Sequence, residues 1–253
     1  KLVMKNALQV EFIPDKLSKL KEYKKNNTSF WIAGGNNNKI IKKLMKNFSL
    51  LESPSKSMIQ TSLKLIDNHF GIVIIKENFF LAAVDCIRSY PIFWRRNNNI
   101  TLLSPNARLI KNKDDLIDNT QLLAFQMSGY TIGKYTVWKN IFNLDAGSFI
   151  FSDIKEKPLN AIKYLDFSPW KSSNKNLTLL KSELKRQIFN LIKKIIKSAN
   201  GRFLVIPLSA GLDSRLIISA LKYFNYKKVK CFSYGLKNNF ESIASKLIAE
   251  QLK

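Results

Sequence analysis

Short apolar runs separated by polar clusters make up most of the amino-terminal half of the chain. The runs are rich in β-branched and aromatic residues, and Gly, Asn, Pro and Ser gather between them, which is the pattern of strands joined by turns. We predict strands at residues 7–13, 30–33, 71–75, 79–84, 91–94, 100–103 and 148–151. Short helices fit between them at about 39–47, 57–67 and 119–128. This half is therefore predicted to be a two-layer or sandwich-like α+β domain.

Two pairs of these runs have the form of hairpins. GIVIIK and FFLAAVD are separated only by the short polar turn Glu77-Asn78. The stretch PIFWRRNNNITLLS repeats this arrangement with an asparagine-rich turn. Each pair is predicted to form two antiparallel strands.

The pattern changes in the carboxyl-terminal part. Residues 164–176 are irregular and form the candidate linker, which divides the chain into predicted domains 1–165 and 166–253. Leu, Ile and Phe then recur at helical spacing from Leu177 to Ser198, which predicts a long amphipathic helix. A short apolar run at 203–208, a helix at 216–224, a strand at 230–234 and a helix from about 240 follow. This alternation is typical of a parallel sheet with crossover helices.

Basic residues outnumber acidic ones by a wide margin. The chain has 42 Lys+Arg against 18 Asp+Glu, a formal net charge of +24 and a pI near 10.0. Such a balance often indicates a nucleic-acid or acidic partner. The lysines are spread among Asn, Ile and Phe along the whole chain, which favours a general compositional bias. Polyanion binding is the less favoured alternative.

The chain carries no sign of membrane insertion or secretion. No window approaches the ~20 apolar residues of a membrane helix, so we expect a cytoplasmic protein without a membrane span. Cys86 and Cys231 lie far apart without a CxxC motif, which supports neither a disulfide framework nor a zinc site; both are predicted to be small buried hydrophobes. Lys1 in place of Met, and an end inside a predicted helix, lead us to expect a fragment that lacks a carboxyl-terminal part.

The stretch IPLSAGLDSR, residues 206–215, lies where a predicted strand gives way to a helix. In α/β units ligands bind at the carboxyl ends of strands, and anions favour the N-termini of helices. Ser209 and Ser214 can donate their hydroxyl hydrogens to phosphate oxygens. The small Ala210 keeps the turn open, and Gly211 is predicted to let the backbone approach a ligand and take a positive φ.

A carboxylate, Asp213, lies in the same stretch. Beside a triphosphate it would be destabilising unless it bound Mg2+, so it is the predicted metal ligand. The spacing differs from G-x-x-x-x-G-K-S/T and from G-x-G-x-x-G. It resembles the S-G-G-x-D-S loop of ATP pyrophosphatases, which holds the β- and γ-phosphates, with Ala210 in place of the second residue. The alternative is that the serines and the aspartate simply cap a helix.

The segment VKCFSYG, 229–235, places a second strand and a turn where this ATPase family holds adenine and ribose. The resemblance implies an ATP site made of Leu208, Ser209, Ala210, Gly211, Asp213, Ser214, Tyr234 and Gly235. Tyr234 is equally consistent with simple packing. Glu241 is either a ligand of the site or an acid favoured by the helix dipole, and Arg215 is either an anion contact or a surface residue.

The first half adds a second resemblance. The segments LAAVDCIRSYPIFW (81–94), ITLLSPNARLI (100–110), GYTIGKYTVWKNIFNLDAGSFI (129–150) and KYLDF (163–167) follow in order the landmarks of the asparagine synthetase family. Nearly the whole chain is collinear with that family. The resemblance implies an Ntn-hydrolase-like αββα sandwich of the class II glutamine amidotransferase type, followed by the start of a PP-loop domain of the adenine nucleotide alpha hydrolase type.

The glutaminase of that family depends on an N-terminal nucleophilic cysteine, and this chain has no cysteine before Cys86. The family's N-G-E glutamine motif is also absent, and Gly34-Gly35-Asn36 is a distant echo of it. We therefore expect a glutaminase-like domain that does not hydrolyse glutamine.

Four other residues of this half receive structural interpretations. Asp85, Arg88 and Pro91 are taken as landmarks of the fold, with Arg88 as a candidate partner of Asp85. His69, the only histidine, has no serine or cysteine partner in a recognisable motif and is predicted to be solvated or at the edge of the core.

The family resemblance implies that MgATP adenylates a carboxylate, releasing pyrophosphate, and that ammonia or another amine attacks the acyl-adenylate. The implied partners are a small carboxylate (an amino acid or sugar acid) and an amine donor, with a homodimer as candidate assembly and surface-polysaccharide biosynthesis as candidate setting. The catalytic acyl-site residues are expected after Lys253. Two alternatives stay open, a tRNA-modifying ATP pyrophosphatase and a non-catalytic degenerate homologue.

Overall fold

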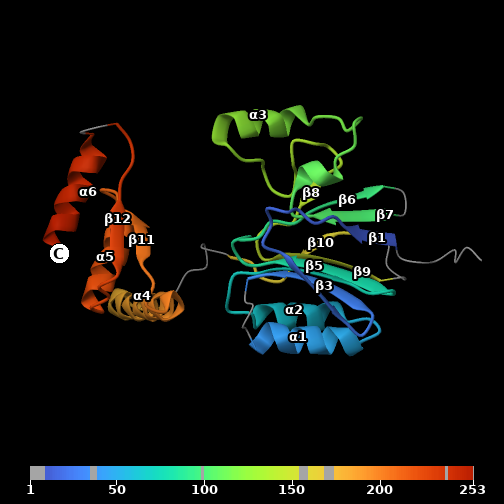
Figure 1. The fold of residues 1–253 in the computed structure, drawn as a ribbon, viewed down its shortest axis with the longest axis horizontal. Coiled ribbons are helices and arrows are strands. Elements are labelled where there is room, and N and C mark those ends of the chain that lie inside the picture. Colours follow the sequence, from blue (N-terminus) through green and yellow to red (C-terminus); the bar gives the residue numbers. More distant parts are fainter. Residues whose placement is uncertain are drawn as a thin grey trace, which may run out of the picture. The chain divides into compact units, whose positions relative to one another are not determined.

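Strands of the amino-terminal half pair into two sheets that stack on each other (Figure 1). The structure, a computed structural model, describes residues 9–34, 39–97, 100–153, 159–167, 174–236 and 239–252. By its internal contacts the chain divides into two units, Lys1–Pro169 and Trp170–Lys253. Each unit is described by itself below.

The larger sheet of the first unit has six strands, all antiparallel, in the order β10-β9-β5-β4-β3-β2. They are β2 (Lys21–Lys25), β3 (Thr28–Ala33), β4 (Gly71–Ile75), β5 (Phe79–Val84), β9 (Ser148–Asp153) and β10 (Ala161–Lys163). All six residues of β5 are buried, because both faces of this central strand are covered. The predicted hairpin of β4 and β5 is confirmed, with Gly71 opposite Val84 and Ile75 opposite Phe80.

The smaller sheet has four strands in the order β1-β7-β6-β8. They are β1 (Gln9–Phe12), β6 (Phe93–Asn97), β7 (Ile100–Ser104) and β8 (Phe142–Asn143). β6 and β7 pair antiparallel, as the hairpin pattern predicts, whereas β1 runs parallel to β7.

Helices α1 (Lys39–Leu50) and α2 (Lys56–Lys64) cover the outer face of the larger sheet (Figure 1). This layer buries Phe48 and Leu63 against Phe30, Ile72 and other sheet residues. The other face of the same sheet packs on the smaller sheet through a second apolar cluster that includes Val73, Phe80, Trp94 and Leu103. The mixed, two-sheet architecture agrees with the predicted α+β sandwich.

The segment after the smaller sheet contains a short 3-10 helix, η1 (Ala107–Ile110), and α3 (Asn119–Ser128). Asp118 caps α3 by accepting from the N–H groups of Thr120 and Gln121, and Gly129 ends it in the left-handed conformation. In Figure 1, α3 lies on the side of the smaller sheet that faces away from the larger sheet. Its apolar side chains Leu123, Phe125 and Met127 are exposed.

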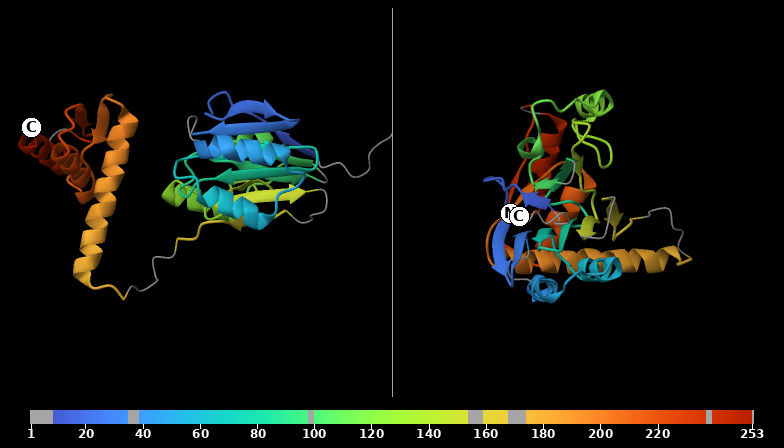
Figure 2. Two further views of the ribbon diagram at one scale, coloured as in Figure 1. Left: turned by 90° about the horizontal axis from the view of Figure 1, so that it is seen from below. Right: turned by 90° about the vertical axis from the view of Figure 1, so that its right-hand side faces the viewer.

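The second unit consists of α4 (Leu177–Ala199), β11 (Leu204–Pro207), α5 (Leu212–Tyr223), β12 (Val229–Phe232) and α6 (Phe240–Gln251). β11 and β12 are parallel neighbours, and α5 connects them, which confirms the predicted crossover arrangement. The long α4 stands out in Figure 2. Helix α5 begins four residues before the predicted start at 216, because polar residues are well tolerated in a first turn that is still exposed.

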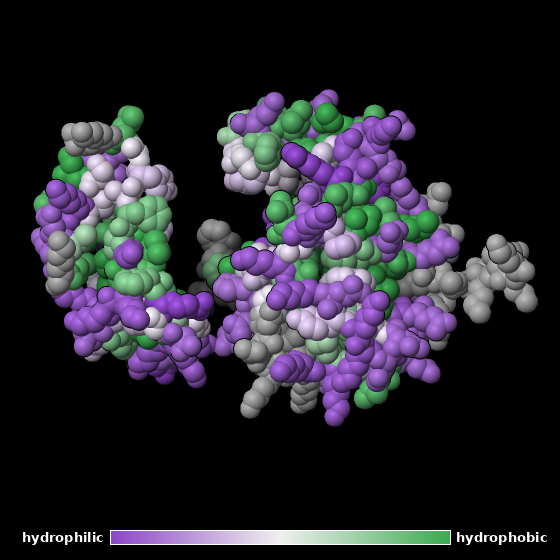
Figure 3. All heavy atoms as spheres, viewed as in Figure 1, coloured by the Kyte–Doolittle hydropathy of each residue, from purple (hydrophilic) through white to green (hydrophobic). Residues whose placement is uncertain are grey.

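One face of this two-stranded sheet forms the core of the second unit. Leu204, Ile206 and Val229 pack with Ile192 of α4 and Leu221 of α5. Alternate residues of each strand are exposed instead, as the period of two dictates. Figure 3 shows hydrophilic side chains spread over the visible face of each unit. None of the helices in the described part of the chain combines the length and hydropathy of a membrane span.

Candidate functional site

The predicted phosphate-binding stretch lies between β11 and α5, at the carboxyl end of β11. We call residues 208–214 the serine loop. Its first residue, Leu208, continues the pairing of the sheet by donating its N–H to the carbonyl of Phe232 at 2.8 Å, and its side chain is buried. The loop is thereby fixed to the edge where ligands of parallel sheets bind.

Ser209 and Ser214 meet across the serine loop. Their hydroxyl oxygens lie 3.1 Å apart, and the Ser214 hydroxyl also accepts from the N–H of Ser209 at 3.1 Å. The Ser209 hydroxyl accepts from the N–H of Gly211 at 3.1 Å. The structure therefore gathers two hydroxyls and the backbone of the loop within hydrogen-bond distance of one another.

The capping interpretation of these side chains is wrong for α5. The residue in the N-cap position is Gly211, and no side chain makes a capping hydrogen bond to this helix. Asp213 is the second residue of the helix and is exposed. The Ser209 hydroxyl accepts instead from the N–H of Gly211, and the Ser214 hydroxyl, on the first turn of α5, accepts from the N–H of Ser209.

The prediction that Gly211 takes a positive φ is also wrong. Its φ is −69° and its ψ is 155°, an extended conformation open to any residue. A Cβ at this position would lie 3.1 Å from the Ser209 hydroxyl, so glycine provides room beside that group. The left-handed position is Gly235, with a φ of +130°, where a Cβ would come within 2.4 Å of the Asn239 amide nitrogen.

The start of α6 reaches the serine loop. Asn239 caps α6 by accepting from the N–H of Ser242 at 2.7 Å, and Glu241 lies in the first turn. A carboxylate oxygen of Glu241 accepts from the N–H of Ala210 at 2.7 Å. Because α5 and α6 both begin near this edge of the sheet, the partial positive charges of two helix N-termini favour an anion here.

The remaining predicted residues lie around the same edge. Tyr234 and Gly235 follow the carboxyl end of β12, and the Tyr234 ring is 81% exposed, 6.4 Å from the Phe232 ring. Arg215 donates from Nε to the carbonyl of Gly211 at 3.3 Å, so its side chain contacts the serine loop. Among the described residues there is no group of three or more His, Cys, Asp or Glu side chains that could hold a metal ion on their own.

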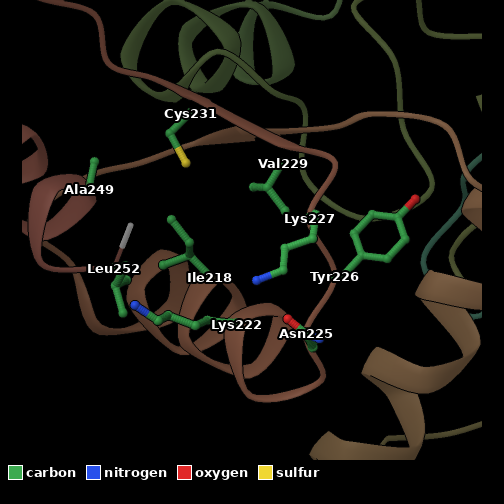
Figure 4. Close-up of a pocket in the computed structure, with 9 residues that line it drawn as sticks. All are labelled: Ile218, Lys222, Asn225, Tyr226, Lys227, Val229, Cys231, Ala249 and Leu252. Atoms are coloured by element: carbon green, nitrogen blue, oxygen red, sulfur yellow. The ribbon is translucent and has the colours of Figure 1, made fainter.

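A cavity of about 490 Å³ in the second unit lies among α5, the segment that follows it, β12 and the end of α6 (Figure 4). Its lining includes Lys222 near the end of α5, Cys231 on β12 and Leu252 after α6. Burial raises the pKa of the Cys231 thiol above its ordinary value. None of the residues that line this cavity belongs to the serine loop, so the two are separate features of the second unit.

In the first unit, Asp85 organises the turn after β5. The side chain is 2% exposed and accepts from the N–H groups of Phe70 and Ile87, each at 2.9 Å, and of Ser89 at 3.3 Å. The predicted pairing of Asp85 with Arg88 is wrong. Arg88 has a positive φ of 55°, and its guanidinium donates to the Asn143 side chain at 2.7 Å.

The burial of Cys86 differs from expectation. The residue is exposed in the turn after β5, so its prediction as a buried hydrophobe is wrong, whereas Cys231 of the second unit is half-buried. His69 is exposed as predicted, but its Nδ1 lies 2.8 Å from the Ser89 hydroxyl. Motif analysis does not find this pair, because its members are 20 positions apart in the chain and the antiparallel strands between them bring them together.

The chain was compared with known proteins. No family model matches it. Over 180 residues it is 23% identical to the putative asparagine synthetase (glutamine-hydrolyzing) 2 of Methanocaldococcus jannaschii. The alignment covers 68% of this chain and 34% of that protein, so the chain spans about a third of the relative's length. The chain is thus distantly similar to an asparagine synthetase, in line with the resemblance of its segments.

Two solved structures give weak matches at 12% sequence identity. One is the glutamine phosphoribosylpyrophosphate amidotransferase of B. subtilis complexed with ADP and GMP, with a TM-score of 0.30 over 57% of this chain and 31% of that chain. The other is described as the allosteric regulatory enzyme of purine biosynthesis, with a TM-score of 0.31 over 91% of this chain and 51% of that chain.

Proposed function

We propose that the protein is an ATP-dependent, amide-forming ligase of the asparagine synthetase type. It adenylates a small carboxylate, releases pyrophosphate, and lets ammonia or another amine attack the acyl-adenylate to give an amide and AMP. The observation that carries this proposal is the serine loop, in which Ser209 and Ser214 meet at the carboxyl end of β11 and at the start of α5. The distant similarity to a putative asparagine synthetase supports the same class of reaction.

The serine loop offers donors suited to the β- and γ-phosphates. A serine hydroxyl both donates and accepts, so Ser209 and Ser214 can keep the bonds that they accept from backbone N–H groups while they turn their hydrogens from acceptors within the loop to phosphate oxygens. The N–H groups at the start of α5 add donors and a favourable dipole. Arg215 lies close enough to the loop to contribute positive charge.

Magnesium fits the donor chemistry at this edge. The exposed carboxylate of Asp213 is a hard oxygen ligand of the kind Mg2+ prefers, and phosphate oxygens and water usually supply the rest of its coordination. When bound, the ion would neutralise charge on the phosphates. Tyr234, exposed after the end of β12, offers a ring on which adenine can stack. Gly235 follows it in the chain, and the N–H of Leu208 bonds to Phe232 at the end of the same strand.

We further propose that the first unit has the fold of a glutaminase-like domain without glutaminase activity. The N-G-E motif of the glutamine site is absent from the given sequence, which supports this proposal. The amine would then come from ammonia or from a different donor.

Exchange of labelled pyrophosphate into ATP tests the ligase directly. We expect the full-length protein to catalyse exchange only when a suitable carboxylate is added from a panel of amino acids and sugar acids. Asp213→Asn should abolish exchange, whereas Glu250→Gln, at an exposed acid near the end of α6 in the same unit, should leave it intact. Unchanged exchange in Asp213→Asn would show that this carboxylate does not hold the metal.

The net charge of +24 favours one alternative, a tRNA-modifying ATP pyrophosphatase. The same assay separates the two enzymes, because exchange that requires tRNA and no carboxylate supports the alternative. The absence of exchange with either class of substrate would instead indicate a degenerate homologue.

A further inference from the structure

The three consecutive N–H groups of the serine loop are held in two different ways. Those of Ser209 and Gly211 donate to serine hydroxyls, at 3.1 Å each. The N–H of Ala210, between them, donates to the carboxylate of Glu241 at 2.7 Å. The middle donor of the loop therefore already binds an anionic group, and that group belongs to a helix 31 residues further along the chain.

A phosphate would affect these bonds differently. A hydroxyl that accepts from an N–H can still donate its own hydrogen, so the two serine contacts are compatible with a bound phosphate oxygen. The carboxylate of Glu241 has no hydrogen to donate and repels a phosphate. To use the N–H of Ala210, a phosphate oxygen must take the place of Glu241.

We propose that Glu241 is an internal occupant of the phosphate site, which makes the serine loop selective for magnesium-bound polyphosphates over small free anions. The inference rests on the proposed function of the loop. Glu241 is held beside the N–H by its own helix, so it competes at a high effective concentration that a weakly bound single phosphate does not overcome. A magnesium polyphosphate makes several contacts at once and carries its own cation, which offsets the repulsion.

Release of Glu241 needs little rearrangement. Its side chain is exposed, so the carboxylate can turn into water when it leaves the N–H. It also remains in the first turn of α6, where the helix dipole favours a negative charge and Asn239 still caps the helix. The contact therefore lowers the affinity of the loop for anions without being needed to build it.

Titration calorimetry with the full-length protein tests this selectivity, with magnesium pyrophosphate and inorganic phosphate as probes. Glu241→Gln weakens the competing bond by removing its charge, and Glu241→Ala removes it. We expect both variants to bind magnesium pyrophosphate about tenfold more tightly. The apparent affinity of the wild type is reduced because only loops whose Ala210 N–H is not occupied by Glu241 can bind the ligand fully. Both should also gain measurable binding of inorganic phosphate. Glu250→Gln, with the same charge change at the exposed far end of α6, should match the wild type.

The outcomes are distinct. Pyrophosphate binding by the wild type with equal or weaker binding by both Glu241 variants would overturn the inference and leave the loop as a pyrophosphate site. No binding by any of the proteins would overturn the proposed function together with the inference. Should the variants fail to fold, the NMR signal of the Ala210 backbone amide in isotopically labelled wild type tests whether the ligand replaces Glu241. This signal should shift strongly when magnesium pyrophosphate is added. If the protein binds the ligand and the signal does not move, the ligand does not replace Glu241 at the Ala210 N–H.

Discussion

The hydroxyls of Ser209 and Ser214 lie 3.1 Å apart across the turn that joins β11 to α5. The Ser214 hydroxyl accepts from the N–H of Ser209, five residues earlier in the chain. This contact ties the first turn of the helix to the end of the strand. The shape of the serine loop thus depends on side chains that are also its candidate phosphate donors.

Replacing Ser214 with alanine should weaken pyrophosphate binding. The substitution removes one hydroxyl donor and leaves the Ser209 N–H without its acceptor. We expect this to reduce the free energy of binding by about 1–1.5 kcal/mol. We expect about a tenfold rise in the dissociation constant for magnesium pyrophosphate, measured by calorimetry. Ser219→Ala, at an exposed position of the same helix, is the matched control. If the two substitutions change the dissociation constant equally, Ser214 does not contribute to binding pyrophosphate.

Replacing Asp85 with asparagine should destabilise the first unit. The buried carboxylate accepts from the N–H groups of Phe70, Ile87 and Ser89, and an amide would point a donor at one of them. Hydrogen bonds to charged groups contribute about 1.5–3 kcal/mol each, so we expect a loss of about 3 kcal/mol in the free energy of unfolding. Urea denaturation followed by tryptophan fluorescence measures it. The exposed Asp114→Asn should change stability by less than about 0.5 kcal/mol, and a similar small change in Asp85→Asn would contradict the role assigned to its carboxylate.

The sequence predicts the central strands of the larger sheet well and its edge strand β2 poorly. The bounds of β4 and β5 match the predicted runs because both strands are buried and almost wholly apolar. β2, with the sequence KEYKK, escapes prediction because all five residues are exposed at the edge of the sheet, where lysines discourage pairing with other chains. Its partner β3 and the tight turn between them, not its composition, make it a strand.

The same limit applies to the candidate site. The clustering of Ser209 with Ser214 follows from local spacing and could be predicted. The contact of Glu241 with Ala210 depends on where α6 begins relative to α5, and the contact of Arg88 with Asn143 joins residues 55 apart in the chain. Charge alone suggested Asp85 as the partner of Arg88. The backbone N–H groups that satisfy Asp85 have no sequence signature.

The two cysteines should react with alkylating agents at different rates. Cys86 is exposed in a turn, whereas Cys231 is half-buried and burial raises the pKa of its thiol. Because the thiolate is the reactive form, we expect iodoacetamide to modify Cys86 in a fast phase and Cys231 in a slow one. Mass spectrometry of timed samples measures both. Cys86→Ser should remove the fast phase, and a fast phase that persists in this variant would contradict the assignment.

The stability of the first unit should fall in alkaline solution because of Tyr164. Its buried hydroxyl donates to the carbonyl of Val84 at 2.8 Å, and burial, followed by the negative charges of Asp85 and Cys86, raises its pKa above the ordinary value of 10.0. Below about pH 10 the phenol is protonated in both the folded and the unfolded state, so it adds no pH dependence. Above that pH the unfolded chain loses the proton while the folded chain retains it. Stability then decreases by up to about 1.4 kcal/mol per pH unit until the folded phenol ionises as well.

Tyr164→Phe separates this effect from the titration of other groups. At neutral pH the variant should be about 1 kcal/mol less stable than the wild type, because it lacks the hydrogen bond to Val84. The difference should shrink and then reverse as the pH rises above about 10, since phenylalanine has no proton to lose. Urea unfolding of both proteins from about pH 8 to about pH 11 provides the comparison. A difference that stays constant across that range would mean that the hydroxyl of Tyr164 ionises as readily in the folded protein as in the unfolded chain, and that its burial does not favour the neutral form.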